Sequence, residues 1–259
     1  MDLGINAETA LVMSSTGGLG FGCAKALADE GVRVVINGRS REKGIDAIKK
    51  LGGNAHFVRA DVSRPAERDK LFQEAKDYLG TISILVNNIN SPSSGTFMSK
   101  TIEDWQNAFE LLMISALDMI SKCLPGMIER GYGRIINISS TSAKEILPGY
   151  TLSNSLKPGL IGALGTLARE AASSGVTVNS ILPGPFDTAM MRRYAHRTIG
   201  RDDVTPEEAD RLIAENEPMK RWGKIEEFGA LCSFLASKHA GYITGQSIVI
   251  DGGKVPALM

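Results

Sequence analysis

The chain has 259 residues, with 29 basic and 29 acidic side chains and a formal net charge of +0 at pH 7. This balance gives no support for nucleic-acid binding through phosphate neutralisation, and the length suits one α/β domain better than two. We find neither the basic flank and apolar run of a secretory signal nor an apolar run near the roughly 20 residues that cross a bilayer. The cysteines follow no CxxC spacing, which favours neither a disulfide framework nor a zinc site; they are Cys23, Cys123 and Cys232. A cytoplasmic protein that binds no membrane and no metal is expected.

Short β-branched runs alternate with longer helical patterns along the chain. The runs are apolar at successive positions, as expected of strands that are buried on both faces. Repeated strand–helix–strand units predict parallel strands joined by right-handed crossovers, and therefore an α/β fold with a doubly wound parallel sheet in a single domain, 1–259. The predicted strands are 9–14, 33–37, 55–59, 82–87, 134–139, 176–182 and 247–251.

The first strand runs into a glycine-rich stretch, SSTGGLG at 14–20, which opens a helical pattern. Glycines let the backbone approach a pyrophosphate, and the helix N-terminus offers unpaired N–H groups and a positive dipole end. A glycine-rich turn alone is weak evidence, but its place between a buried strand and a helix strengthens it. The stretch predicts a dinucleotide-binding turn.

The next two strands end in polar residues. The strand at 33–37 leads into NGRS, which contains Arg39, with Arg41 nearby. An acidic residue there would hold an adenosine ribose and repel a 2′-phosphate, so Arg39 predicts NADP rather than NAD. The alternative is that Arg39 is a solvated residue near a helix cap. The strand at 55–59 leads to Asp61, which is placed to reach an adenine amino group.

Two long helices are expected, at about 101–129 and 152–172. A capping box of Thr101 and Asp104 begins the first, and Thr205 followed by Pro206 begins a later helix. Apolar residues occupy more than one side of both long helices. This extra apolar surface lies either against the sheet or in a contact between subunits.

Residues 185–224 depart from the alternation, because they are too long and too polar for a simple crossover. One interpretation is an amphipathic surface helix, and the other is a substrate lid over a binding crevice. Apolar and basic side chains share this segment: Met190, Met191, Arg192, Arg193, Tyr194 and His196.

The order of these landmarks resembles the short-chain dehydrogenase/reductase family over nearly the whole chain. The matching motifs are SSTGGLG at 14–20, NNIN at 87–90, NISS at 137–140, VNSILPGPFDT at 178–188 and YITGQSIVIDGG at 242–253. The first glycine of the family's turn is replaced by Ser14, and the glycine of the fourth-strand motif by Asn90. Cofactor binding is nevertheless expected. The resemblance implies these cofactor contacts: Ser14, Ser15, Gly18, Leu19, Gly20, Arg39, Asp61, Val62, Asn88, Lys157, Pro183, Gly184 and Thr188.

The family's usual catalytic set is Asn, Ser, Tyr and Lys. By resemblance, Ser140 polarises the substrate carbonyl and Lys157 binds the ribose. The tyrosine position, four residues before Lys157 on one helix face, holds Ser153, and the asparagine position holds Leu112. The expected catalytic residues are therefore Ser140, Ser153 and Lys157, in a 3-oxoacyl-ACP reductase-like chain that lacks the usual Tyr and Asn.

The proton source is left open. A serine hydroxyl is a far weaker acid than a phenol, whose pKa is about 10. Tyr150 lies seven residues before Lys157, about 10 Å along a continuous helix, which is too far unless the helix begins after it. The alternative is a water that fills the space of the missing phenol ring and relays a proton from Lys157.

These observations support three functions. The first is an NADP-dependent oxidoreductase on a small carbonyl or alcohol substrate, with 3-oxoacyl thioesters as the class that the resemblance suggests. The second is an NADP-binding sensor or silent partner of an active paralogue, and the third is a lyase or isomerase. In family relatives the two long helices pair across a two-fold axis, so a homotetramer or homodimer is expected.

Overall fold

The seven apolar runs form one sheet in the computed structural model, which describes residues 1–199 and 205–256. The side chains at 196–198 and 206 lie outside the described residues, and so do His196 as a candidate and positions 200–204 of the expected lid. Every strand pairs in parallel. The order is β3-β2-β1-β4-β5-β6-β7, with β1 Thr9–Val12, β2 Arg33–Gly38, β3 Ala55–Arg59, β4 Ile84–Asn88, β5 Gly133–Ile138, β6 Val176–Pro183 and β7 Ser247–Ile250. The predicted doubly wound α/β fold is confirmed.

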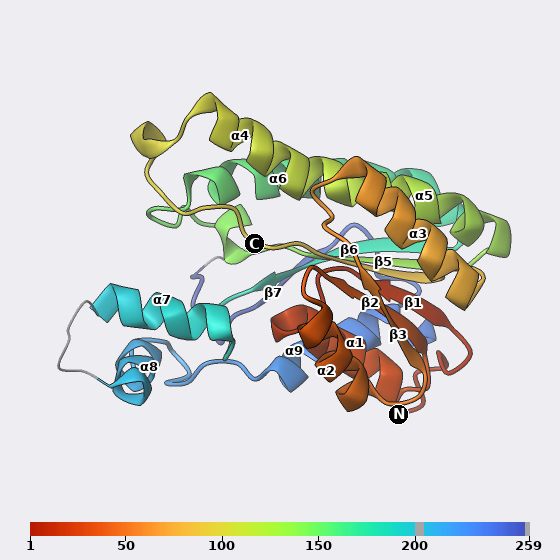
Figure 1. Cartoon of the computed structure of the whole chain (residues 1–259), viewed down its shortest axis with the longest axis horizontal. Helices are drawn as coiled ribbons and strands as arrows, with labels where there is room; N and C mark the ends of the chain where they lie inside the picture. Colours follow the sequence, from red (N-terminus) through yellow and green to blue (C-terminus); the bar gives the residue numbers. More distant parts are fainter. Residues whose placement is uncertain (200–204, 257–259) are drawn as a thin grey trace.

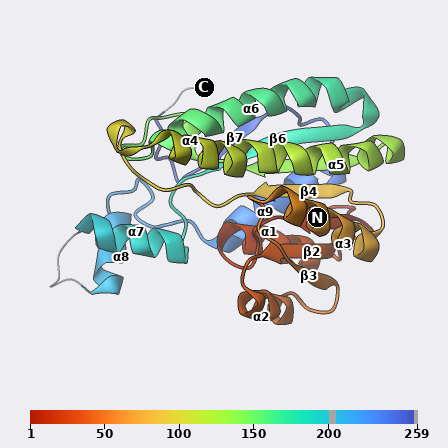
Figure 2. The same ribbon diagram turned by 45° about the horizontal axis from the view of Figure 1, so that its top comes forward.

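Helices cover both faces of the sheet (Figures 1 and 2). The helices α3, α5 and α6 pack on one face, whereas α1, α2 and α9 pack on the other. Figure 1 shows α7 and α8 beyond the carboxyl end of the sheet. The bounds are α1 Gly18–Asp29, α2 Arg41–Leu51, α3 Pro65–Leu79, α4 Ile102–Phe109, α5 Ser115–Arg130, α6 Thr151–Ala171, α7 Ala189–Ile199, α8 Pro206–Ala214 and α9 Ile225–Ala236.

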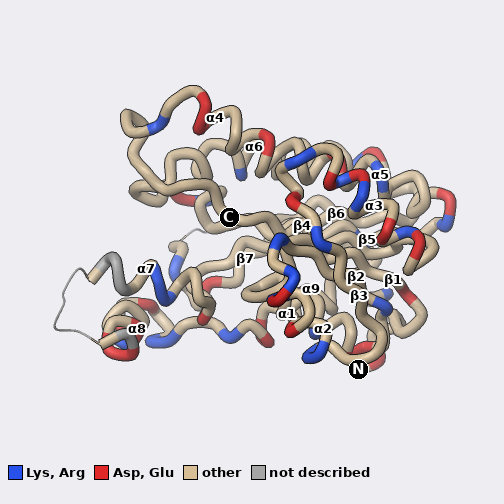
Figure 3. Tube along the Cα trace, in the orientation of Figure 1, with Lys and Arg blue, Asp and Glu red and all other residues tan. Residues whose placement is uncertain are grey.

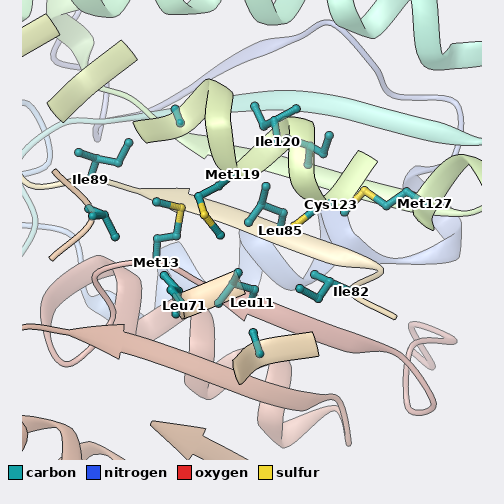
Figure 4. Close-up of a cluster of buried hydrophobic side chains, with 14 of the residues drawn as sticks. Leu11, Met13, Leu71, Ile82, Leu85, Ile89, Met119, Ile120, Cys123 and Met127 are labelled. Atoms are coloured by element: carbon teal, nitrogen blue, oxygen red, sulfur yellow. The ribbon is translucent and has the colours of Figure 1, made fainter. Parts of the chain in front are cut away.

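Successive strand residues enter different hydrophobic cores. Leu11 of β1 is paired with Leu85 of β4, and both point toward Met119 and Cys123 of α5 (Figure 4). The neighbouring Val12 belongs to the core on the opposite face. Burial on both faces explains why the strand sequences are apolar at successive positions instead of alternating.

The long helix expected at about 101–129 is interrupted. A π-helical turn, Glu110–Ile114, separates α4 from α5. The predicted capping box is present, because Thr101 Oγ1 accepts from the Asp104 N–H at 3.1 Å and Asp104 Oδ2 accepts from the Thr101 N–H at 2.9 Å. Single-turn π segments occur frequently at functional sites, and this one carries Leu112 toward the core.

By length and composition, Ile102–Arg130 is one helical segment that could cross a membrane. This differs from the expectation that no run approaches that length. The segment packs against the sheet and α6 in this fold, and 39% of its most apolar window is buried. A core-flanking helix of an α/β fold passes the same test, so the segment is weak evidence for a membrane span.

Backbone hydrogen bonds connect the two ends of the insertion at 185–224. The Asp187 N–H donates to the Gly223 carbonyl at 2.8 Å, and the Gly223 N–H donates to the Pro185 carbonyl at 3.0 Å. Between these ends, α7 and α8 are linked by Arg192, whose Nη1 lies 2.6 Å from Asp210 Oδ2. Lys, Arg, Asp and Glu are interspersed along the helices that face the viewer in Figure 3, without a face of one sign.

Candidate active site

Three adjoining cavities lie along the carboxyl edge of the sheet, where β1 and β4 are neighbours although β2 and β3 come between them in the chain. Open α/β sheets bind ligands at such a switch point. A cavity of about 850 Å³ contains Arg39. A second of about 570 Å³ extends from the glycine turn to Lys157. A third of about 550 Å³ contains Ser153. We call them the adenosine, central and substrate-side cavities.

The glycine turn opens α1 as predicted. Gly18 has a φ of 58°, in the left-handed region that favours glycine. A Cβ at Gly20 would lie 2.3 Å from Asn88 Nδ2 and 3.0 Å from the Ser14 carbonyl, so only glycine fits there. No described side chain caps the helix, and its first turn has no acidic residue. Its N–H groups therefore offer an anion site beside the central cavity.

Ser14 has a strained backbone conformation at the position where the resemblance led us to expect a glycine. Its φ is 45°, and the left-handed region costs a non-glycine residue roughly 1–2 kcal/mol. Two side chains hold it there: its N–H donates to Asn37 Oδ1 at 3.1 Å, and its carbonyl accepts from Asn88 Nδ2 at 2.7 Å. The sequence reasoning missed Asn37, a fully buried amide that also donates to the Ala60 carbonyl at 2.9 Å.

Ser15 has a different position from the one expected. Its hydroxyl donates to the Val12 carbonyl at 2.6 Å and accepts from the Asn37 N–H at 3.3 Å. Its own N–H donates to the Asn37 carbonyl at 2.8 Å, and the residue is fully buried. Because these groups are used inside the protein, Ser15 shapes the turn and does not line the cavities.

Arg39 and Asp61 come together in the adenosine cavity. Arg39 Nη1 lies 4.0 Å from Asp61 Oδ2, and the Arg39 side chain is 70% exposed. Burial opposes ionisation of Asp61, but hydrogen bonds from Ser63 and the nearby arginines outweigh it and lower the pKa of Asp61. Sequence reasoning missed Lys43, which lines both this cavity and the central one. The basic spacing in NGRSREK was the available signal.

Lys157 is buried at the end of the central cavity. Its Nζ donates to the Ser139 carbonyl at 2.9 Å, and burial lowers its pKa to about 8. Ser140 lines both the central and the substrate-side cavity. Its Oγ accepts from the Ser142 N–H at 3.1 Å, which leaves the Ser140 hydroxyl hydrogen available for a carbonyl oxygen.

Ser153 and Leu112, the positions at which the resemblance led us to expect Tyr and Asn, both lie near Lys157. Ser153 is 5% exposed on α6 and lines the substrate-side cavity, while Lys157 lines the central one. Leu112 borders a small cavity of about 10 Å³, which is on the order of the space that one water needs. Lys157 and Ser139 also line this small cavity. The cavity beside the amine is thus at the lower limit of the space that one water occupies.

Tyr150 lies outside the helix. It is the N-cap residue of α6, which begins at Thr151. The helix therefore begins after Tyr150, and the separation of about 10 Å along a continuous helix does not apply. Tyr150 lines the substrate-side cavity with Ser140 and Ser153, and its ring lies 6.5 Å from that of Tyr194.

The segment after β6 closes the central cavity. Pro183 and Gly184 line it, and a Cβ at Gly184 would lie 2.5 Å from the Asp251 Cβ. Thr188 Oγ1 accepts from the Met191 N–H at 3.2 Å, which caps α7. A Cβ at Gly18 would lie 3.7 Å from Thr188 Cγ2, so this segment and the glycine turn face each other.

Among the described residues that line the substrate-side cavity, Lys254 is the one charged residue. Its Nζ lies 2.6 Å from Oε1 of Glu217, whose side chain is only 7% exposed. Sequence reasoning missed this pair, because the two residues belong to separate segments 37 positions apart.

Leu19 and Asn88 also line the central cavity, and Val62 lines the adenosine cavity. Most of the expected cofactor residues therefore line the adjoining adenosine and central cavities, which together form one groove. Ser15 and Gly20 do not line this groove.

Comparisons with known proteins show the family to which the chain belongs. The NADPH-dependent reductase BacG of Bacillus subtilis is 31% identical over 98% of this chain and 100% of its own length. The acetoacetyl-CoA reductase of Cupriavidus necator is 32% identical over 94% of this chain and 96% of its own. The crystal structure of L-sorbose reductase from Gluconobacter frateurii, complexed with NADPH and L-sorbose, superposes with a TM-score of 0.94 at 30% identity and covers all of both chains.

A family model described as enoyl-(acyl carrier protein) reductase matches residues 13–254. That range includes the glycine turn, Ser140, Lys157 and the segment after β6. The chain belongs to the short-chain dehydrogenase/reductase family.

Proposed function

We propose that this protein is an NADPH-dependent reductase of a small carbonyl substrate. The observation that carries the proposal is the position of Ser140, which lines both the central and the substrate-side cavity. A carbonyl held by Ser140 would lie where the two cavities meet. The NADPH-dependent relatives support the choice of cofactor.

The residues of the groove fit the cofactor. The glycine turn leaves an uncapped helix N-terminus for a diphosphate, and exposed Arg39 stands at the adenosine end for a 2′-phosphate. Among the described residues that line the central cavity, the charged ones are all cations: Lys43, Lys157 and Arg193. Such a lining suits an anionic dinucleotide.

Ser140 and Lys157 would have different roles in the reduction of the carbonyl. The reduced nicotinamide supplies a hydride to the carbonyl carbon when it is bound. Ser140 donates a hydrogen bond to the carbonyl oxygen and stabilises the negative charge that develops there. The oxygen then takes one proton, and the product is an alcohol.

We propose Lys157 as the source of that proton. Its pKa of about 8 keeps much of the amine protonated at neutral pH while making the ammonium a better acid than an ordinary lysine. The space in the substrate-side cavity beside Ser153 would hold a water that passes the proton on, and solvent would reprotonate the amine. Tyr150 is the second candidate, since it lines the same cavity as Ser140.

The decisive experiment follows NADPH oxidation with a panel of 3-oxoacyl thioesters and ketoses. Wild-type turnover is expected, with a loss of about 10²–10⁴-fold in Lys157→Met and a smaller loss in Ser140→Ala. Tyr150→Phe should retain activity, and its failure to do so would reassign the proton donor to the phenol. Binding of NADPH without oxidation by any carbonyl would contradict the proposal and favour the sensor or the non-redox enzyme.

We further propose that 185–224 acts as a substrate lid. The helix α7 contributes Met190 to all three cavities and Tyr194 to the substrate-side cavity. The hydrogen-bonded base at Asp187 and Gly223 gives the insertion two fixed ends. A lid that lines both the cofactor and the substrate regions would exclude water when both are bound.

Assembly as a homodimer or homotetramer is also proposed, through the α4–α5 segment and α6. Exposed Ile102, Phe109 and Ile128 on that segment support it. Light scattering of the purified chain tests it, and a monomer at micromolar concentration would contradict it.

A further inference from the structure

We infer that Arg193 of α7 binds the diphosphate of the cofactor, opposite the glycine turn. The inference deepens the proposed function, on which it rests for the identity of the ligand. It assigns a phosphate contact to the insertion, in addition to those expected from the glycine turn.

The position of Arg193 supports this role. Arg193 lines both the adenosine and the central cavity. The residues that the two cavities share mark their junction, and they are Ser14, Thr16, Lys43, Asn90, Ser91, Met190 and Arg193. A dinucleotide that spans both cavities must place its diphosphate between its two nucleosides, and therefore near this junction.

The charges at the junction support an anion. Within the described part of the chain, Lys43 and Arg193 are the charged residues that the two cavities share, and both are cations. Lys43 belongs to the first turn of α2, whereas Arg193 comes from α7, so the two cations reach the junction from different elements. A guanidinium binds phosphate oxygens through two parallel hydrogen bonds, which suits it to a diphosphate.

The neighbouring arginine provides a contrast. Arg192 forms ion pairs with two aspartates of the same chain: its Nε lies 2.8 Å from Asp187 Oδ1 and its Nη1 lies 2.6 Å from Asp210 Oδ2. Arg193 makes no hydrogen bond or ion pair within the part of the chain that the structure describes. Arg192 therefore fixes α7, and the guanidinium of Arg193 remains for a ligand.

Titrations of intrinsic and NADPH fluorescence with Arg193→Gln test the inference. The Kd values for NADPH and NADH should rise by the same factor, about 10-fold, because both cofactors carry the diphosphate. The matched control is Arg211→Gln on α8, whose guanidinium lies 3.9 Å from Glu208 and 3.7 Å from Glu215 and lines none of the three cavities. It should leave both Kd values unchanged, and circular dichroism should show that all variants are folded.

Two results would overturn the assignment. Unchanged affinity for both cofactors would remove Arg193 from the site, and weaker binding of NADPH alone would move it to the 2′-phosphate. These titrations need no substrate, so a wild-type chain that binds NADPH without reducing any carbonyl would defeat the proposed function and leave this inference standing. A wild-type chain that binds neither nucleotide would overturn both.

Discussion

The ammonium of Lys157 lies 2.9 Å from the backbone carbonyl of Ser139, in a position that is 7% exposed. One neutral carbonyl compensates the charge only partly, and burial lowers the pKa of Lys157 to about 8. The central group of the site therefore titrates in the range where enzymes are assayed.

The pH dependence of reduction follows from that value. Because the proposed donor is the ammonium, kcat/KM for carbonyl reduction should be constant well below pH 8 and fall about tenfold per pH unit above it. The reverse oxidation should rise through the same range, since it needs the neutral amine. Initial rates between pH 6 and about 10 measure both arms. A flat profile would exclude Lys157 as the proton donor.

Lys157→Met should stabilise the fold at neutral pH. The native pKa of about 8 lies below the unfolded value of 10.5, so the native state disfavours the proton by on the order of 3 kcal/mol. Loss of the Ser139 hydrogen bond offsets about 1 kcal/mol, which leaves a gain of about 2 kcal/mol. The gain should be complete below pH 8, where Lys157 is charged in both states. It should shrink as pH rises from 8 to 10.5, because the native amine is then neutral and releasing its proton costs less the closer the pH is to the unfolded pKa. Urea unfolding at pH 7 and pH 10 checks the sign.

Ser153→Tyr should restore an acid to the site. The residue lies on α6 one turn before Lys157 and lines a cavity of about 550 Å³, which has room for a ring. Reduction should increase about 10²–10⁴-fold. Ser153→Phe carries the same ring without the hydroxyl and should show no gain. Equal rates in the two variants would mean that the ring alone is responsible.

Arg39→Asp should change the cofactor preference. The side chain is 70% exposed in the adenosine cavity, and a carboxylate there would repel a 2′-phosphate. The Kd for NADPH should rise about 10–100-fold, while that for NADH stays the same or falls. Arg41→Asp, two positions along and not on the cavity wall, is the matched control. An unchanged preference in Arg39→Asp would refute the role assigned to this residue.

Gly20→Ala should damage the glycine turn. The new methyl group would lie 2.3 Å from Asn88 Nδ2, so the hydrogen bond that holds Ser14 must break. We expect a loss of about 1–3 kcal/mol in stability and weaker NADPH binding. The control, Gly53→Ala, adds a methyl group where no atom lies within 4 Å. Thermal unfolding of the two variants should differ accordingly.

The sequence alone determined the fold and the order of its landmarks. Strand burial on both faces leaves a direct trace in composition, and for this reason the buried strand β6, Val176–Pro183, was predicted to within one residue, at 176–182. Glycine at positions 18 and 20 and the i, i+4 relation of Ser153 and Lys157 are local features, which a chain shows before it folds.

Only the tertiary structure decided which groups meet across the groove. The pairing of Lys254 with Glu217, the contact of Asn37 with Ser14 and the position of Arg193 between two cavities join segments far apart in the chain. The same holds for the lowered pKa of Lys157, because burial depends on everything packed around the amine. Such relations arise from packing in three dimensions, and no local pattern records them.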